Sequence, residues 1–417
     1  MTRQLAKMNR ITGCQRHLQN KRNNFICILA LIVMSTSCEK RSDVVALSVE
    51  NNLSFERQEV VSVQRRYIDN ILKGKDEVGV MVREKGSEKF QVIQWIDNTT
   101  DGQSDELLFQ VNVGANATKE YEIIWSEKAE QLQPNSDLTT YSRFVPERTD
   151  DYAWENDKVA FRTFGPEAQR LTEINDPLGT LSSGIDIWLK RVNYSIIDKW
   201  YQGNLDDPGY YHIDHGEGHD PYHVGKSRGA GGIGIWKDNS LITSKNFINY
   251  KTITNGPLRT VFEIDYAPWS EFNVEERKRI SLDLGSNFSK VEISLKTNNA
   301  PNYTIGITTH DLNGEERLNI EKGWFRYWEK IDSAYLGVGV VIDPGVVKQA
   351  FVYESTTPDQ SQILIVNEPT LTNLTYYTGF AWTKSGQINS QEDWDQMLEK
   401  QAQVLANPLK IQIAIGH

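Results

Sequence analysis

The strongest constraint on the fold is an alternation of apolar and polar residues that recurs in short runs along the chain. Examples are "FQVIQWI", "YEIIW", "RTVFEIDY", "KVEISLKT" and "KIQIAI", each bounded by Asn, Asp, Gly or Pro. Successive side chains of a strand point to opposite faces, so this pattern predicts strands with one buried face and one exposed face. The chain is therefore expected to be all-β and built from antiparallel sheets.

One long helical pattern interrupts the strands, in "SQEDWDQMLEKQAQVLANP" near the C-terminus. The apolar residues that fall on one face of this helix are Trp394, Met397, Leu398, Ala402 and Leu405. Ser390 can cap its start and Pro408 can close its end. The pattern predicts a surface helix packed on a sheet, just before the final strand.

The distribution of polar residues predicts two β-domains. The polar stretch "QLQPNSDLTTYSRFVPERTDDY" contains two prolines and has the composition of a linker. We expect residues 38–140 to form a small β-sandwich of roughly immunoglobulin size, and residues 141–417 to form a large β-sandwich that carries the functional site.

The first 37 residues have the organisation of a secretory signal. They contain six Lys and Arg and no Asp or Glu, followed by the apolar run from Phe25 to Met34, which is too short to span a bilayer. Cys38 follows three small residues, as at the lipidation site of a bacterial lipoprotein. We expect an exported protein, lipid-anchored through Cys38 at the outer membrane, in the periplasm or on the cell surface. An ordinary signal peptide cut nearby is the alternative.

The mature chain is acidic and has no thiol pair. All three cysteines lie within the first 38 residues, which excludes a disulfide framework or a cysteine-based centre in a chain that starts at Cys38. Residues 38–417 hold 39 Lys and Arg against 56 Asp and Glu, a formal charge of −17 with His neutral. Nucleic acid is therefore not an expected partner, and an anionic substrate would need a local cluster of cations.

Four of the seven histidines fall within twelve positions of one segment, "HIDHGEGHDPYHVGKSRGAGGIGIW". Its glycines and prolines exclude a continuous helix. Three interpretations stay open: a solvated polar loop, a divalent metal site with His215, His219 and His223 among the ligands, or an acid–base centre. The glycines lead into a strand rather than a helix, which disfavours a nucleotide-binding loop.

Several cations are candidates for binding an anionic substrate. Lys226 and Arg228 lie in the same segment as the histidines, while Arg162 and Lys190 lie in apolar or aromatic strand contexts. For Arg162 and Lys190 the alternative is a surface cation whose stem lies along an aromatic ring.

The runs "GIDIWLKRVNYSIIDKWY", "YYHIDHGEGHDPYHVGKSRGAGGIGIW" and "LTYYTGFAWTKSG" resemble a family of secreted and lipid-anchored Bacteroidota proteins. These proteins are encoded in polysaccharide-utilisation gene clusters and were long known only as a domain of unknown function. The resemblance implies a galactose-mutarotase-like β-sandwich. It also implies a dehydratase activity in ulvan breakdown, which removes water from a saturated glucuronic or iduronic acid at the non-reducing end of a sulfated oligosaccharide to give a 4,5-unsaturated uronate.

This chemistry requires a base for the proton on carbon 5, an acid for the leaving hydroxyl, and a cation for the carboxylate. The expected base is His215 or His212, and the expected acid or second base is Tyr222 or Tyr211. Asp214 and Glu217 are expected to fix the imidazole tautomers. The carboxylate or sulfate is expected to bind Lys226 and Arg228, with Arg162 and Lys190 as further candidates. No cofactor is required, although a divalent metal is a possibility left open.

Three other functions remain as alternatives at this point. A uronate-specific polysaccharide lyase would expel an alcohol from inside the glycan chain. A glycoside hydrolase or mutarotase would use a carboxylate pair, for which Asp214 and Glu217 are candidates. A lipid-anchored glycan-binding protein would have no catalytic residues.

Overall fold

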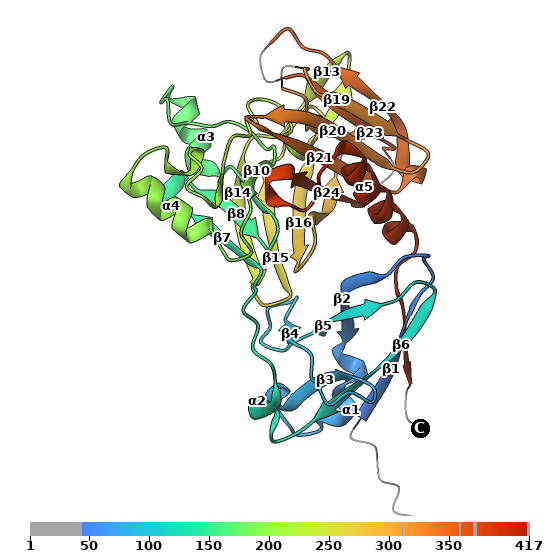
Figure 1. Cartoon of the computed structure of the whole chain (residues 1–417). Helices are drawn as coiled ribbons and strands as arrows, with labels where there is room; N and C mark the ends of the chain where they lie inside the picture. Colours follow the sequence, from blue (N-terminus) through green and yellow to red (C-terminus); the bar gives the residue numbers. More distant parts are fainter. Residues whose placement is uncertain (1–43, 311, 358–359, 370–372, 415–417) are drawn as a thin grey trace, which may run out of the picture. The chain divides into compact units, whose positions relative to one another are not determined.

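The computed structural model describes residues 44–310, 312–357, 360–369 and 373–414 (Figure 1). The predicted signal peptide, residues 1–37, and the predicted lipid-bearing Cys38 lie outside these ranges. Within them, no helix is both long enough and apolar enough to cross a membrane.

Two antiparallel sheets face each other in the N-terminal part of the described chain. One has the order β25 (Lys410–Ala414), β1 (Val44–Asn51), β6 (Ala117–Trp125) and β3 (Val80–Glu84). The other has the order β2 (Arg57–Gln64), β5 (Glu106–Val113) and β4 (Ile93–Ile96). Alternate residues of these strands form one core, and short helices α1 (Asp69–Leu72) and α2 (Ala129–Leu132) lie in the connections. The final strand, β25, pairs with β1, so this part uses both ends of the described chain.

The largest hydrophobic core contains side chains from an eight-stranded sheet and a five-stranded sheet. The eight-stranded sheet has the order β14 (Phe247–Thr254), β15 (Arg259–Tyr266), β16 (Glu275–Asp283), β17 (Phe288–Lys296), β24 (Asn373–Trp382), β21 (Ala334–Ile342), β20 (Trp324–Ile331) and β19 (Glu315–Asn319). The five-stranded sheet has the order β13 (Ser240–Ile242), β12 (Ala230–Lys237), β18 (Tyr303–Thr308), β23 (Gln362–Asn367) and β22 (Val347–Tyr353).

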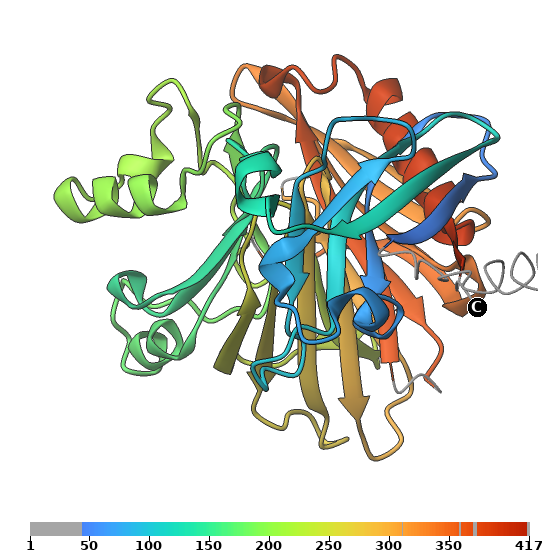
Figure 2. The same ribbon diagram turned by 90° about the horizontal axis from the view of Figure 1, so that it is seen from below.

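A second five-stranded sheet positions the histidine segment. Its order is β11 (Gly218–His219), β10 (Asp186–Lys190), β9 (Ala160–Thr163), β8 (Asp151–Glu155) and β7 (Tyr141–Val145). Helix α4 (Ile197–Asp206) packs on this sheet through Trp200 and Tyr201, which join a separate core with Trp188 and Tyr211. In Figure 2, α4 is the light-green helix at the left of the view. Helix α3 (Pro166–Glu173) follows β9.

The predicted all-β fold of antiparallel sandwiches with a C-terminal helix is confirmed. Every ladder between named strands of the described residues is antiparallel. Helix α5 (Gln391–Ala406) begins with a capping box between Ser390 and Asp393, and it buries Trp394 and Leu398. The sequence pattern missed α3 and α4, which are too short to display a long apolar stripe. The predicted boundary at residue 140 stays a prediction.

Candidate functional site

The histidine segment is a loop that crosses the edge of the sheet carrying α4. A short 3₁₀ turn, Tyr210–His212, follows the helix, and the loop then pairs with β10 through β11 before entering β12. At Gly218 the backbone has φ +117°, and a Cβ atom there would lie 1.8 Å from the carbonyl oxygen of Leu189. Only glycine allows this close approach, which holds the loop against the strand.

His212 is the histidine of this loop whose surroundings suit it best to act as a base. Its Nδ1 atom lies 2.8 Å from the backbone carbonyl oxygen of Asp220, and 54% of its side chain is exposed. A carbonyl oxygen only accepts hydrogen bonds, so neutral His212 carries its proton on Nδ1 and leaves the Nε2 lone pair to accept a proton.

Tyr211 forms a buried support for this imidazole. The two rings meet edge to face, with centroids 4.6 Å apart, and the phenol ring also stacks on Trp188 at 5.1 Å. The Tyr211 hydroxyl accepts a hydrogen bond from Arg148 Nε at 2.9 Å. Arg148 and His212 therefore both contact Tyr211, and no described residue accepts a hydrogen bond from the Nη2 atom of Arg148.

A buried charge cluster lies beneath these residues and centres on Arg162. Its Nε donates to Asp186 at 2.6 Å, its Nη2 donates to Asp220 at 2.8 Å, and its Nη1 lies 3.6 Å from Asp151. Because Arg162 is on β9, Asp186 on β10 and Asp220 in the loop, the cluster fixes the loop to the sheet. The Oδ2 atom of Asp220 also lies 3.6 Å from His212 Nδ1.

The carboxyl groups of this cluster are shifted towards their neutral forms. Burial raises the pKa of Asp151 to about 6, although Arg162 and Arg148 oppose the shift. Burial also raises the pKa of Asp220 well above its usual range, and the neighbouring Asp186 charge adds to that effect. For Arg148, burial lowers the pKa, but attraction by the Asp151 carboxylate raises it further, so its pKa is raised overall. The cluster thus keeps Arg148 charged where it contacts Tyr211, whose ring also contacts His212.

The structure brings together only two of the six residues predicted to be catalytic, His212 and Tyr211. The His215 ring stacks on Tyr210 with centroids 4.0 Å apart, and its Nε2 lies 3.2 Å from the Tyr210 carbonyl oxygen. Tyr222 is buried elsewhere, edge to face with His310 at 4.9 Å. Burial raises the pKa of Tyr222 well above its usual range, which makes it harder to ionise.

Asp214 and Glu217 do not fix imidazole tautomers, so their predicted role is corrected. Asp214 pairs with Arg191 at 2.9 Å and accepts hydrogen bonds from the backbone of the loop. Glu217 pairs with Lys199 at 2.7 Å and accepts a hydrogen bond from Trp200 on α4. Both carboxylates shape the loop, and Asp220 is the residue that orients an imidazole.

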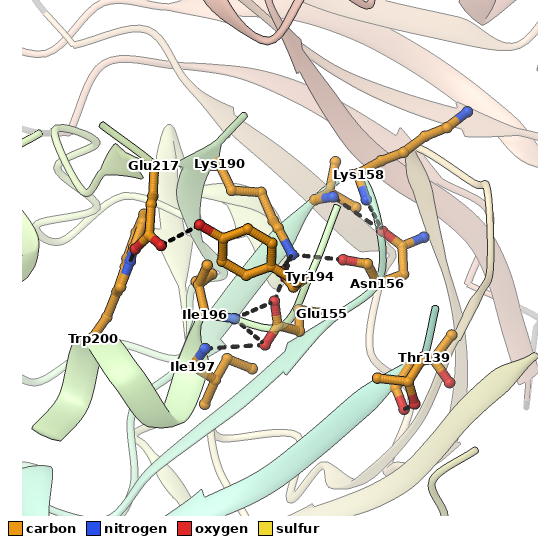
Figure 3. A network of polar contacts seen from close by, with 12 residues as sticks. Thr139, Glu155, Asn156, Lys158, Lys190, Tyr194, Ile196, Ile197, Trp200 and Glu217 are labelled. Atoms are coloured by element: carbon orange, nitrogen blue, oxygen red, sulfur yellow. Dashed lines mark hydrogen bonds and ion pairs between the residues drawn. The ribbon is translucent and has the colours of Figure 1, made fainter. Parts of the chain in front are cut away.

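Three of the four predicted substrate cations are buried away from any external ligand. Lys190 Nζ binds Glu155 at 2.7 Å and the carbonyl oxygens of Asn156 and Tyr194 (Figure 3). Arg228 is enclosed in the interior, where it donates to Ser183 at 2.7 Å and burial lowers its pKa to about 10. Arg162 is occupied by its three carboxylates. Lys226 alone of the four is exposed.

The alternative metal site is not assembled in this structure. Within the described ranges, no group of three His, Cys, Asp or Glu residues is arranged to hold a metal ion. Of the three histidines proposed as ligands, His215 contacts Tyr210, and His219 Nε2 lies 2.8 Å from Asp332. The His223 carbonyl oxygen accepts a hydrogen bond from His310 Nε2.

The sequence analysis missed four residues of the site: Arg148, Asp151, Asp186 and Asp220. Asp186 and Asp220 could have been found from the sequence. Asp186 is a charged residue within the apolar, strand-like run "GIDIWLK", and Asp220 lies in the histidine segment itself. In the structure Asp186 lies directly opposite Arg162 in the β9–β10 ladder. Arg148 and Asp151 carried no such signal, since their roles depend on contacts between distant segments.

The model of a protein family described as "Domain of unknown function (DUF4861)" matches residues 49–411. The chain belongs to this family. A relative from the marine Bacteroidota Formosa agariphila, named "Uncharacterized protein P7", is 41% identical over 391 residues, which cover 92% of this chain and 98% of the relative. Membership of the family agrees with the resemblance seen in the sequence and assigns no activity.

Two solved structures from Enterococcus faecalis resemble this DUF4861 protein more distantly. One is a protein in glycosyl hydrolase family 38, with a TM-score of 0.49 and 10% identity, and the other is an alpha-mannosidase, with a TM-score of 0.46 and 9% identity. Each match covers 90% of this chain but only 48% and 46% of those chains, so this chain spans about half their length. No functional argument rests on so distant a likeness.

The raised pKa of Asp151 predicts a specific pH dependence of stability. A carboxyl group whose pKa rises from 3.8 to about 6 on folding stabilises the folded state at low pH, and this contribution is lost as pH rises through about 6. Relative to the wild type, Asp151→Asn should gain roughly 3 kcal/mol in free energy of unfolding between about pH 4 and pH 7. Denaturant unfolding across this range measures the difference.

The matched control for this measurement is Asp137→Asn, at an exposed position. The same pH dependence in Asp151→Asn and in the wild type would contradict a carboxyl group that takes up a proton on folding.

The buried Lys190–Glu155 pair predicts a large loss of stability when its cation alone is removed. Lys190→Met leaves the Glu155 carboxylate with backbone donors and no counter-charge, so the free energy of unfolding should fall by about 3–5 kcal/mol. The double variant Lys190→Met/Glu155→Gln should recover most of this loss. Chemical denaturation measures both, with Lys237→Met in an exposed ion pair as the control. A loss no larger than the control's would contradict a structural role for Lys190.

Proposed function

We propose that this protein is a dehydratase acting on a saturated glucuronic or iduronic acid at the non-reducing end of ulvan-type oligosaccharides. The product is the 4,5-unsaturated uronate. One observation carries the proposal: Tyr211 contacts both the Arg148 guanidinium and an accessible imidazole, His212, which Asp220 holds in the tautomer that leaves Nε2 free to accept a proton. The motif resemblance supplies the substrate class.

The reaction begins at carbon 5 of the terminal uronate, whose proton is only weakly acidic next to an ionised carboxylate. In this proposal Arg148 pairs with the substrate carboxylate and stabilises the charge that develops on it. His212 Nε2 removes the proton from carbon 5. The electron pair of that C–H bond forms the double bond between carbons 4 and 5, and the bond from carbon 4 to its hydroxyl oxygen breaks.

The leaving hydroxide must receive a proton to depart as water. In glucuronate the hydrogen on carbon 5 and the hydroxyl on carbon 4 lie on the same ring face, so the His212 imidazolium can return the proton to the leaving oxygen. In iduronate they lie on opposite faces, and a second proton donor is needed on the other side of the ring. His212 alone therefore favours the glucuronate substrate.

The buried cluster supports the imidazolium that forms during this step. The Asp220 carboxyl group lies 3.6 Å from Nδ1, so a positive charge on His212 favours the ionised form of that carboxyl group and is in turn stabilised by it. Arg162 holds that carboxylate in place from the other side. Asp220 and Arg162 are positioning residues in this account, since His212 and Arg148 are the groups proposed to touch the substrate.

The setting proposed for this activity follows from the sequence. A sulfated, uronate-containing oligosaccharide is the proposed partner, and the exposed Lys226 in the same loop is available to a sulfate group. The proposed location is outside the cytoplasm, with a lipid on Cys38 as the contact with the membrane.

The test is to incubate purified mature protein with saturated glucuronate-ended sulfated oligosaccharides, before and after treatment with a chelator. The wild type should produce the ultraviolet absorbance of an unsaturated uronate and a mass loss of one water without chain shortening. His212→Ala should lower kcat by roughly 10²–10⁴-fold, the contribution of a positioned general base.

His215→Ala is the comparison that separates the two bases predicted from the sequence, because both histidines lie in the same loop and His215 is already stacked on Tyr210. Its activity should stay close to that of the wild type. Loss of activity in His215→Ala with full activity in His212→Ala would contradict the assignment. Chain cleavage by the wild type would identify a polysaccharide lyase instead.

A further inference from the structure

A second candidate site lies outside the histidine loop, in a groove of about 860 Å³. Its walls are the outer face of β15, β16, β17 and β24, strand β2 and helix α5. Its volume falls in the range of roughly 300–1,000 Å³ that small-ligand pockets occupy. The groove shares no residue with the His212 site, so the proposed reaction leaves it without a role.

The lining of the groove combines apolar and polar side chains. Tyr377 and Met397 contribute partly buried apolar surface. Among the polar side chains, Arg259 donates to Asp283 at 2.7 Å, and Arg279 donates to Glu263 at 2.9 Å. A pyranose ring has an apolar face, which can pack on an aromatic ring such as that of Tyr377. Neighbouring hydroxyl groups at its edge can bind an arginine donor and a carboxylate acceptor that lie side by side.

Contacts between distant segments fix the walls of this groove. Arg279 Nη2 also donates to Asn98 of the loop after β4, and Gln94 of β4 donates to the Arg259 carbonyl oxygen at 2.8 Å. Gln94 also accepts hydrogen bonds from the backbone of Leu258 and Arg259 at 2.9 Å. These hydrogen bonds hold the walls of the groove in place before a ligand binds, so binding does not have to order them.

Six cations and five carboxylates line the groove, so the formal charge of its lining is +1, and Lys158 and Lys400 are two of the six cations. Lys158 lies in the turn between β8 and β9 and Lys400 lies on α5, and no described residue forms an ion pair with either. Figure 3 shows the Lys158 side chain extending away from Asn156. Lys400 lies over the Phe55 ring at 5.7 Å. In a mature chain of formal charge −17, a groove whose lining has a formal charge of +1 is the more favourable surface for an acidic ligand.

We propose that this groove is a non-catalytic binding site for an anionic oligosaccharide, with Tyr377 and the Arg259–Asp283 pair contacting sugar rings and Lys158 and Lys400 contacting sulfate or carboxylate groups. The choice of ligand rests on the proposed function, whereas the groove itself does not. Such a site holds a sulfated glycan on the protein independently of catalysis at His212.

Isothermal titration calorimetry on full mature chains tests this site, with a sulfated uronate-ended oligosaccharide as the probe. The His212→Ala background prevents turnover during the titration. The double variant Lys158→Glu/Lys400→Glu should bind the probe about tenfold more weakly than its parent, because charge reversal beside a bound anion repels it. Lys348→Glu, at an exposed position of β22, is the matched control and should bind like the parent.

Each outcome bears on the groove separately from the dehydratase activity. Unchanged affinity in the double variant, or an equal loss in Lys348→Glu, overturns the groove as the binding site. If the double variant binds the probe more weakly but the wild type releases no water, the groove is supported and the dehydratase proposal is removed. If the wild type releases water but the double variant binds the probe like its parent, the dehydratase proposal is supported and the groove is overturned as the binding site.

Discussion

The site depends on one buried interaction, that of the Arg162 guanidinium with the carboxylates of Asp186, Asp220 and Asp151. It connects two adjacent strands, the histidine loop and β8 through a single side chain. An arginine in this position can serve all three partners because its donors form a planar fork. Without Arg162, three buried carboxylates would face each other, and the loop would lose its attachment to the sheet.

The same interaction explains why His212 is a plausible base although it lies on the surface. Its Nδ1 proton is held by the Asp220 backbone, and the Asp220 side chain is held by Arg162. Charged groups buried in this way contribute little net stability, because desolvation offsets their attraction. Their value to the protein is positional, since they leave the imidazole one tautomer and keep Arg148 charged at its contact with Tyr211.

The sequence predicted the sheets and α5 well because those elements follow local patterns. The alternation of apolar and polar residues in "RTVFEIDY" and "KVEISLKT" corresponds to alternating buried and more exposed side chains in strands β15 and β17. Ser390 caps α5, as its position in the sequence predicted. The loop was predicted less well, because the partner of each polar side chain depends on segments far away in the sequence. Glu217 accepts a hydrogen bond from Trp200 on α4, and Arg228 donates to Ser183 in the interior of the sandwich. The spacing of residues within the loop could not predict either contact. The density of titratable residues marked this loop as the candidate site in the sequence, and only the tertiary contacts show what each of these side chains binds.

The most direct test of the account is a crystal structure of the His212→Gln protein with a saturated glucuronate-ended oligosaccharide bound. The account predicts that the terminal carboxylate pairs with Arg148 and that carbon 5 lies about 3–3.5 Å from the residue 212 side chain, within reach for proton transfer. A terminal uronate bound at the histidine loop with its carboxylate away from Arg148 and its carbon 5 out of reach of residue 212 would contradict His212 as the base.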